Sequence, residues 1–170
     1  VLVFNLNSSN ELVDKVPDYV LGQTNMSAHV SAESQSGLTE PYGLAYDAVG
    51  NRLFVAETYE NRVKVFDVAS ITNGENAVNI LGQTNFTDDV ADNTQSGLYY
   101  PTGLAYDASS TRLFVSEFSG NRVKVFDVAS ITNGENAVNI LGQGNFVDAD
   151  AADTQSGLRG PRGLAYDAVG

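Results

Sequence analysis

The sequence has no cysteine, so it contains no disulfide framework, no thiolate nucleophile and no cysteine metal site. It has a single histidine, His29, so a zinc site built on two or three histidines cannot form within one chain. No Ser-His-Asp arrangement recurs along the chain. We therefore interpret His29 as an ordinary loop residue.

Basic residues are scarce as well. Nine Lys and Arg stand against 21 Asp and Glu, which gives a formal net charge of -12. Such a charge opposes binding to phosphate backbones or anionic lipids, because both need a surface rich in Lys and Arg. No run approaches the roughly 18 to 20 continuous apolar residues of a membrane helix. We expect no nucleic-acid partner and no membrane span.

What the sequence does contain is a repeat with a period of 60 residues. Gly-Leu-Ala-Tyr-Asp begins at Gly43, Gly103 and Gly163, and residues 61–83 recur without change at 121–143. A partial copy opens the chain. Because 42% of the residues are hydrophobic and 18% charged, the composition is that of a globular protein.

Four segments of each repeat have the composition of strands. In one copy they lie at 103–106, 112–116, 122–126 and 137–141. β-branched and aromatic residues dominate them, turn-forming residues separate them, and helical periodicity is absent. The pattern predicts four short antiparallel strands per repeat.

A single sheet of this size exposes both faces, and stacking of neighbouring sheets buries its apolar side chains on both sides. We therefore predict an all-β protein of four-stranded antiparallel β-propeller blades. A β-solenoid is the structural alternative, but its coils are usually shorter than 60 residues and its strands parallel. The predicted units are a partial blade (strands three and four) at 1–23, complete blades at 43–83 and 103–143, the first strand of a further blade at 163–170, and inter-blade loops at 24–42, 84–102 and 144–162.

These units amount to eleven strands, which is fewer than three complete blades. A closed propeller needs about four to eight blades. We expect an incomplete propeller or a segment of a longer array. Open apolar faces and unpaired edges favour association. The expected partners are therefore other copies of the chain or the rest of a longer array.

Three motifs occur in order: PTGLAYD at 101–107, RLFVSE at 112–117 and NRVKVFD at 121–127, and the same pattern recurs at 41–67. In this order they resemble the NHL repeat. The resemblance covers nearly the whole chain and implies a propeller, commonly with six blades. WD-type repeats are disfavoured, because tryptophan and Gly-His are absent. The long polar loops ending in Gln-Ser-Gly-Leu depart from the NHL pattern, and we expect them to carry function or to bridge the blades.

Glutamates at equivalent positions are candidate metal ligands. Glu57 and Glu117 follow the second strand of their repeats, so a ring could align them around one mouth. A resemblance to propeller lactonases would imply that they hold Ca²⁺. The alternative, which we prefer, is an ion pair with Arg62 or Arg122 across the hairpin.

The loop acids are weaker candidates. Carboxylates are the ligands that Ca²⁺ prefers, but the spacing of these acids is not that of an EF-hand loop. We interpret them as solvated side chains and expect no bound metal and no cofactor. They are Asp148, Asp150 and Asp153 in one loop, and Asp88, Asp89 and Asp92 in another.

Three sequons make Asn7, Asn25 and Asn85 candidates for glycosylation. Two of them occupy equivalent loops. Sugars there would cover polar loops of an extracellular protein.

Near-verbatim copying favours scaffolding, because a catalytic site needs different residues at different positions. We predict a non-enzymatic structural or interaction scaffold, extracellular or at the cell surface, that self-assembles into a fibre and takes protein or glycan ligands. The alternative is a metal-assisted hydrolase or lyase of the calcium type that uses Glu57 and Glu117. A third hypothesis is the RNA- or protein-binding NHL module of ubiquitin-ligase regulators, but its RNA-binding form needs a basic face.

Overall fold

A computed structural model describes residues 1–167 of the chain. The described residues form ten strands and no helix. Among them there is accordingly no helix long and apolar enough to cross a membrane.

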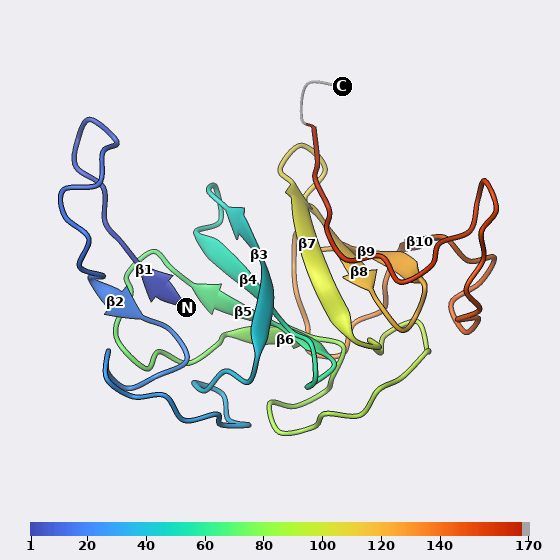
Figure 1. Ribbon diagram of the computed structural model, residues 1–170, viewed down its shortest axis with the longest axis horizontal. Helices are drawn as coiled ribbons and strands as arrows, with labels where there is room; N and C mark the ends of the chain where they lie inside the picture. Colours follow the sequence, from blue (N-terminus) through green and yellow to red (C-terminus); the bar gives the residue numbers. More distant parts are fainter. Residues whose placement is uncertain (168–170) are drawn as a thin grey trace.

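Eight strands form two four-stranded antiparallel sheets, each in sequential order (Figure 1). The remaining two, β1 (Leu2–Val3) and β2 (Tyr19–Val20), pair with each other. The first complete blade consists of β3 (Pro41–Asp47), β4 (Arg52–Glu57), β5 (Arg62–Asp67) and β6 (Asn79–Leu81), and the second of β7 (Pro101–Asp107), β8 (Arg112–Glu117), β9 (Arg122–Asp127) and β10 (Asn139–Leu141).

The observed strands of the two blades span 41–81 and 101–141, about two residues earlier at each end than the predicted 43–83 and 103–143. Each first strand begins at a proline, which is tolerated there because the first residue of a strand need not donate to the ladder. Each last strand ends before a glycine with positive φ, as at Gly82, where φ is 92°.

Side chains of β4 alternate between two hydrophobic cores. Phe54 and Ala56 lie in the core shared with the second blade, and Val55 lies in the core shared with the β1–β2 pair. Complete burial of one large apolar side chain contributes roughly 1.5–3 kcal/mol. Packing on both faces therefore stabilises this blade.

The first strands of the two blades, β3 and β7, lie beside each other near the middle of the molecule (Figure 1). Gly43 allows this approach, because a Cβ atom there would lie 2.1 Å from the Thr102 carbonyl oxygen. The rings of Phe54 and Tyr106 stack across the interface with centroids 5.9 Å apart. The fold is thus all-β and built from four-stranded antiparallel propeller blades stacked face to face.

The predicted first strand of a further blade, 163–170, falls partly outside the described residues, which end at Asp167. For 163–167 the prediction is wrong, since these residues form no strand. A strand needs a partner for its ladder, and none of the ten described strands pairs with this segment.

The segment nevertheless packs on β7 as β7 packs on β3. A Cβ atom at Gly103 would lie 2.1 Å from the Arg162 carbonyl oxygen, the same distance as at Gly43. Phe114 and Tyr166 stack with centroids 6.1 Å apart. The segment therefore covers the outer face of the second blade.

The first two connecting loops are attached to the following blade by the same hydrogen bonds, and all three loops are closed by the same kind of bridge. Gln95 donates a side-chain hydrogen bond to the Ala137 carbonyl at 2.7 Å, and the Ala137 amide donates to the Gln95 carbonyl at 3.1 Å. These bonds attach the loop to the blade that follows. Each loop is also closed by a bridge between two glycines: Gly22 with Gly37, Gly82 with Gly97, and Gly142 with Gly157.

Candidate functional site

The two glutamates predicted at a channel mouth are buried inside the blades. The side chain of Glu57 is 0% exposed, and its Oε2 lies 2.7 Å from Arg62 Nε and 3.1 Å from Lys64 Nζ. Its Oε1 accepts a hydrogen bond from the Thr39 amide at 2.7 Å. Each blade thus contains a buried cluster of one acid and two bases.

The second blade repeats the arrangement. Glu117 Oε2 lies 2.6 Å from Arg122 Nε and 3.5 Å from Lys124 Nζ, and its Oε1 accepts from the Tyr99 amide at 2.7 Å. The hypothesis that the two glutamates line a mouth is wrong for the described residues, because the flanking loops cover both carboxylates. A metal ion would have to displace two cations at each one.

The arginine holds the loop that follows its blade. Arg62 Nη1 donates to the carbonyls of Phe86 and Asp88 at 2.8 and 3.1 Å. Arg122 Nη1 makes the same bonds one repeat later, at 2.6 and 3.0 Å. The ion pairs with glutamate match the preferred interpretation of these two arginines. Their hydrogen bonds to the loop carbonyls were not predicted.

The lysine holds the loop that precedes its blade. Lys64 Nζ donates to the Ser34 carbonyl at 2.8 Å and to the Gly37 carbonyl. Lys124 Nζ bonds the corresponding carbonyls, with 2.7 Å to the oxygen of Thr94. Burial lowers the pKa of Lys124 to about 8, against the opposing attraction of Glu117. The long polar loops are therefore structural parts of the blades.

The predicted loop ligands Asp148, Asp150 and Asp153 are exposed, and they are not among the clusters of potential metal ligands found in the described chain. Asp153 pairs with Arg159 at 2.7 Å, and both side chains are largely exposed. Asp148 accepts a hydrogen bond from the Asn145 side chain at 2.7 Å. The geometry gives no support to a metal site at these three acids.

The sequon residues Asn7, Asn25 and Asn85 lie in exposed loops. The Oδ1 atom of each accepts a hydrogen bond from the amide two residues later. His29 is also exposed, and its Nδ1 lies 3.3 Å from the Ser27 carbonyl oxygen. Glycosylation of the asparagines stays a prediction.

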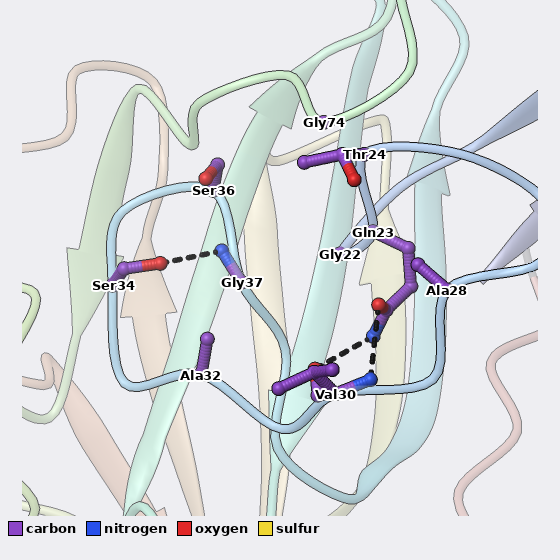
Figure 2. A pocket seen from close by; sticks show the side chains of 10 residues that line it. All are labelled: Gly22, Gln23, Thr24, Ala28, Val30, Ala32, Ser34, Ser36, Gly37 and Gly74. Carbon is purple, nitrogen blue, oxygen red and sulfur yellow. Dashed lines mark hydrogen bonds between the residues drawn. The ribbon is translucent and has the colours of Figure 1, made fainter.

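A cavity of about 250 Å³ lies inside the first connecting loop, and Figure 2 shows the side chains that line it. Gln23 crosses the loop, with its Nε2 donating to the Val30 carbonyl at 2.9 Å and its Oε1 accepting from the Val30 amide at 3.2 Å. Gln83 and Gln143 make the matching bond in their own loops, each at 2.8 Å. The glutamine bond across the loop is therefore a repeated structural feature, and nothing in the small and neutral lining of the cavity marks it as a site.

A second depression, of about 210 Å³, is lined by aromatic side chains from both blades and by Arg162. We call it the aromatic groove. Tyr59 and Tyr42 are 54% and 61% exposed, and the rings of Tyr59 and Tyr100 meet edge to face at 5.2 Å. The Arg162 guanidinium lies 4.3 Å from the centre of the Phe118 ring. The full lining is Glu40, Tyr42, Thr58, Tyr59, Tyr100, Thr102, Phe118 and Arg162.

The eight groove residues occupy only four positions of the repeat, and every one of those positions differs between copies. By contrast, 61–83 and 121–143 are identical. The groove is therefore lined by positions at which the repeats differ in sequence. In repeat order, the four positions hold Glu40, Tyr100 and Gly160; Tyr42, Thr102 and Arg162; Thr58 and Phe118; and Tyr59 and Ser119.

Backbone strain marks the same place. Glu40 and Tyr100 have φ angles of 45° and 53°, and the third copy has Gly160 at 54°. A side chain in the left-handed region costs about 1 kcal/mol relative to glycine. Two copies thus carry a side chain where glycine would be unstrained, and such strain is typical of functional surfaces. Sequence reasoning missed the groove, although the aromatic substitutions between copies were a signal that could have found it.

No family model matches the sequence. NHL repeat-containing protein 2 of Bos taurus is 29% identical over 100 residues, which cover 56% of this chain and 13% of that protein. The Homo sapiens protein of the same name is 30% identical over 110 residues, or 59% of this chain and 14% of that protein. The chain is thus similar to NHL repeat proteins, which supports the resemblance that its three motifs carry. It spans about one seventh of the length of these curated relatives.

Among solved structures, a luciferin-regenerating enzyme is similar with a TM-score of 0.42 at 17% sequence identity, over 64% of this chain and 31% of that one. A likeness of this size carries no argument about activity. Within this chain, the residues that are identical between copies form the blades, and residues that differ between copies line the aromatic groove.

Proposed function

We propose that the chain is a non-enzymatic interaction scaffold whose aromatic groove receives a basic segment of a partner protein. One observation carries this proposal: every position that lines the groove differs between copies of an otherwise repeated unit. In repeat proteins the copied residues maintain the stack, and the variable ones on one face give specificity.

The chemistry of the groove favours a cationic ligand. Tyrosine, phenylalanine and arginine are enriched at protein interfaces, and aromatic faces attract Lys and Arg. Tyr42 and Tyr59 present exposed rings, Glu40 lies on the lining, and the chain carries a net charge of -12. Arg162 over Phe118 is a cation–ring pair within the groove itself. A Lys- and Arg-rich segment complements both the rings and the charge.

The test compares three fluorescently labelled peptides of equal length that are basic, neutral and acidic. Their affinities for the chain are measured by fluorescence anisotropy. We expect the basic peptide to bind most tightly, with an affinity that falls as salt is added. In Tyr59→Ser, which copies the Ser119 of the next repeat, we expect affinity to fall about fivefold, the loss of one cation–ring contact.

Val49→Ser is the matched control, because it also copies the next repeat, at Ser109, and lies outside the groove with 86% exposure. It should bind the basic peptide like the unmodified chain. Equal binding of all three peptides, or an affinity unchanged by Tyr59→Ser, would count against the proposal.

Extracellular location and assembly into a fibre stay predictions from the sequence. Light scattering that finds only non-associating particles would contradict the fibre. The alternative, a metal-assisted hydrolase, has no support from the contacts of Glu57 and Glu117, since both carboxylates are already paired with buried cations.

A further inference from the structure

Three acidic side chains from separate segments meet beside the first complete blade. Carboxylate oxygens of Glu33, Glu60 and Asp89 all lie within 4.8 Å of one another. Glu33 comes from the loop before the blade, Glu60 from the turn between β4 and β5, and Asp89 from the loop after the blade. The cluster therefore joins both loops to one hairpin.

Glu60 is the buried member of this cluster, and it lacks a hydrogen-bonding partner. Its residue exposure is 5%, and its Oε2 accepts no hydrogen bond. Arg62 Nη2 lies 3.9 Å from that oxygen, beyond hydrogen-bond reach, and makes no hydrogen bond of its own. A buried carboxylate oxygen without a partner is costly, so this one points to a missing ligand.

The local charges leave room for a divalent cation. Within the buried part, the carboxylates of Glu57 and Glu60 balance Arg62 and Lys64. Glu33 and Asp89 add two further negative charges at the exposed side of the same cluster. A divalent cation would neutralise the excess.

The second blade provides an internal comparison, because it has the same main chain at this place and none of the acids. The Asn61 side chain donates to the Asp89 carbonyl at 2.8 Å, and Asn121 donates to the Ala149 carbonyl at 2.8 Å. The positions equivalent to Glu33, Glu60 and Asp89 hold Asn93, Gly120 and Ala149.

The arginine of the second blade is also better satisfied. Arg122 Nη2 lies 3.3 Å from Asn93 Oδ1 and forms a hydrogen bond with it, whereas Arg62 Nη2 has none. One blade thus closes this corner with neutral groups. The other fills it with three acids that repel one another.

We propose that Glu33, Glu60 and Asp89 form a Ca²⁺ site that ties both connecting loops to the first complete blade. All three ligands are carboxylate oxygens, which suit a hard cation. Oxygens at 2.3–2.6 Å from Ca²⁺ lie up to about 5 Å apart across the ion, whereas around Mg²⁺ they lie only about 4 Å apart. The exposure of Glu33 and Asp89 allows water to complete the coordination.

Isothermal titration calorimetry of the purified chain with calcium chloride alone tests the site. We expect one ion per chain with a Kd on the order of 10⁻⁴ M, because only three protein ligands bind. Glu60→Gln and Asp89→Ala should each weaken binding about tenfold or more. Asp89→Ala copies Ala149 on the same main-chain scaffold, so it decides the question even where Glu60→Gln does not fold.

Asp153→Asn is the charge-matched control, because it removes an exposed acid outside the cluster. It should bind Ca²⁺ like the unmodified chain. Absence of binding at about 10 mM calcium, well above any expected Kd, would overturn the site. So would an affinity that Asp89→Ala leaves unchanged, or one that Asp153→Asn reduces equally.

Discussion

At the scale of single residues, the buried bases decide how the loops are held. The Val-Lys-Val pattern of β5 and β9 alternates, and such a pattern ordinarily places the lysine in solvent. Lys64 and Lys124 are instead completely buried, because the connecting loops fold over them and present carbonyl oxygens. Main-chain acceptors about 30 residues away leave no mark in the sequence, so the pattern alone could not predict this burial.

Removing the acid of a buried cluster should destabilise the fold. In Glu117→Gln, Arg122 and Lys124 remain buried without their counter-charge. We expect the free energy of unfolding to fall by about 3 kcal/mol, as for other broken buried ion pairs. Urea denaturation measures the change.

The exposed pair Asp153–Arg159 provides the control for that measurement. Asp153→Asn should leave the free energy of unfolding nearly unchanged, since exposed ion pairs contribute little. Equal losses in the two variants would contradict a special role for the buried cluster.

The lysine also makes stability depend on pH. Burial lowers the pKa of Lys124 to about 8 from its ordinary 10.5. Between these two values the unfolded chain binds more protons at this group than the folded chain does, so its contribution to the free energy of unfolding rises with pH. We expect the stability of the unmodified chain relative to Lys124→Met to be greater near pH 9.5 than near pH 7.5.

Denaturation of both proteins in urea at the two pH values checks this sign. Groups common to both proteins cancel in the difference. A constant difference would show that Lys124 keeps its ordinary pKa, and a difference that falls with pH would show that folding raises this pKa; either result would contradict the prediction.

At the scale of elements, the close approach of first strands governs the stacking of blades. Gly43→Ala would place a Cβ atom 2.1 Å from the Thr102 carbonyl oxygen, a main-chain atom of β7. We expect a loss of about 2 kcal/mol or more in the free energy of unfolding, because the two strands must separate. Chemical denaturation measures it.

Gly163→Ala tests the same motif position without the neighbouring strand, since no atom of the described residues, apart from those next to it in the chain, lies within 4 Å of a Cβ there. It should be nearly neutral. If both substitutions cost the same, the stacking of β3 on β7 does not depend on the glycine.

The strands could be predicted from the sequence, whereas the pairing of the last segment and the structure of the loops could not. Alternation and turn residues indicated four strands per repeat, because those signals are local. Residues 163–167 carry the same Gly-Leu-Ala-Tyr-Asp signal and form no strand, because the ladder partner that a strand requires is not local. The loops were predicted only as polar, since their structure depends on contacts with Gln95, Arg62 and Lys64.

At the scale of the whole molecule, residues that are identical between repeats form the blades, and residues that differ between repeats line the groove. The aromatic groove gathers side chains from two blades and from the segment after them, so no single stretch of sequence reveals it. Of the residues predicted as site candidates, Glu57 and Glu117 turned out to be part of the frame. Comparing the copies position by position is the one sequence signal that points to the groove.

The most direct test of the proposed binding surface is a map of the backbone amide chemical shifts that change when the basic peptide is added to the isotopically labelled chain. We predict that the changes gather at the groove, around residues 40–42, 58–60, 99–102 and 160–162. Shifts that instead gather on the outer strands β6 and β10, or no shifts at all, would contradict the claim that the variable positions form a binding surface.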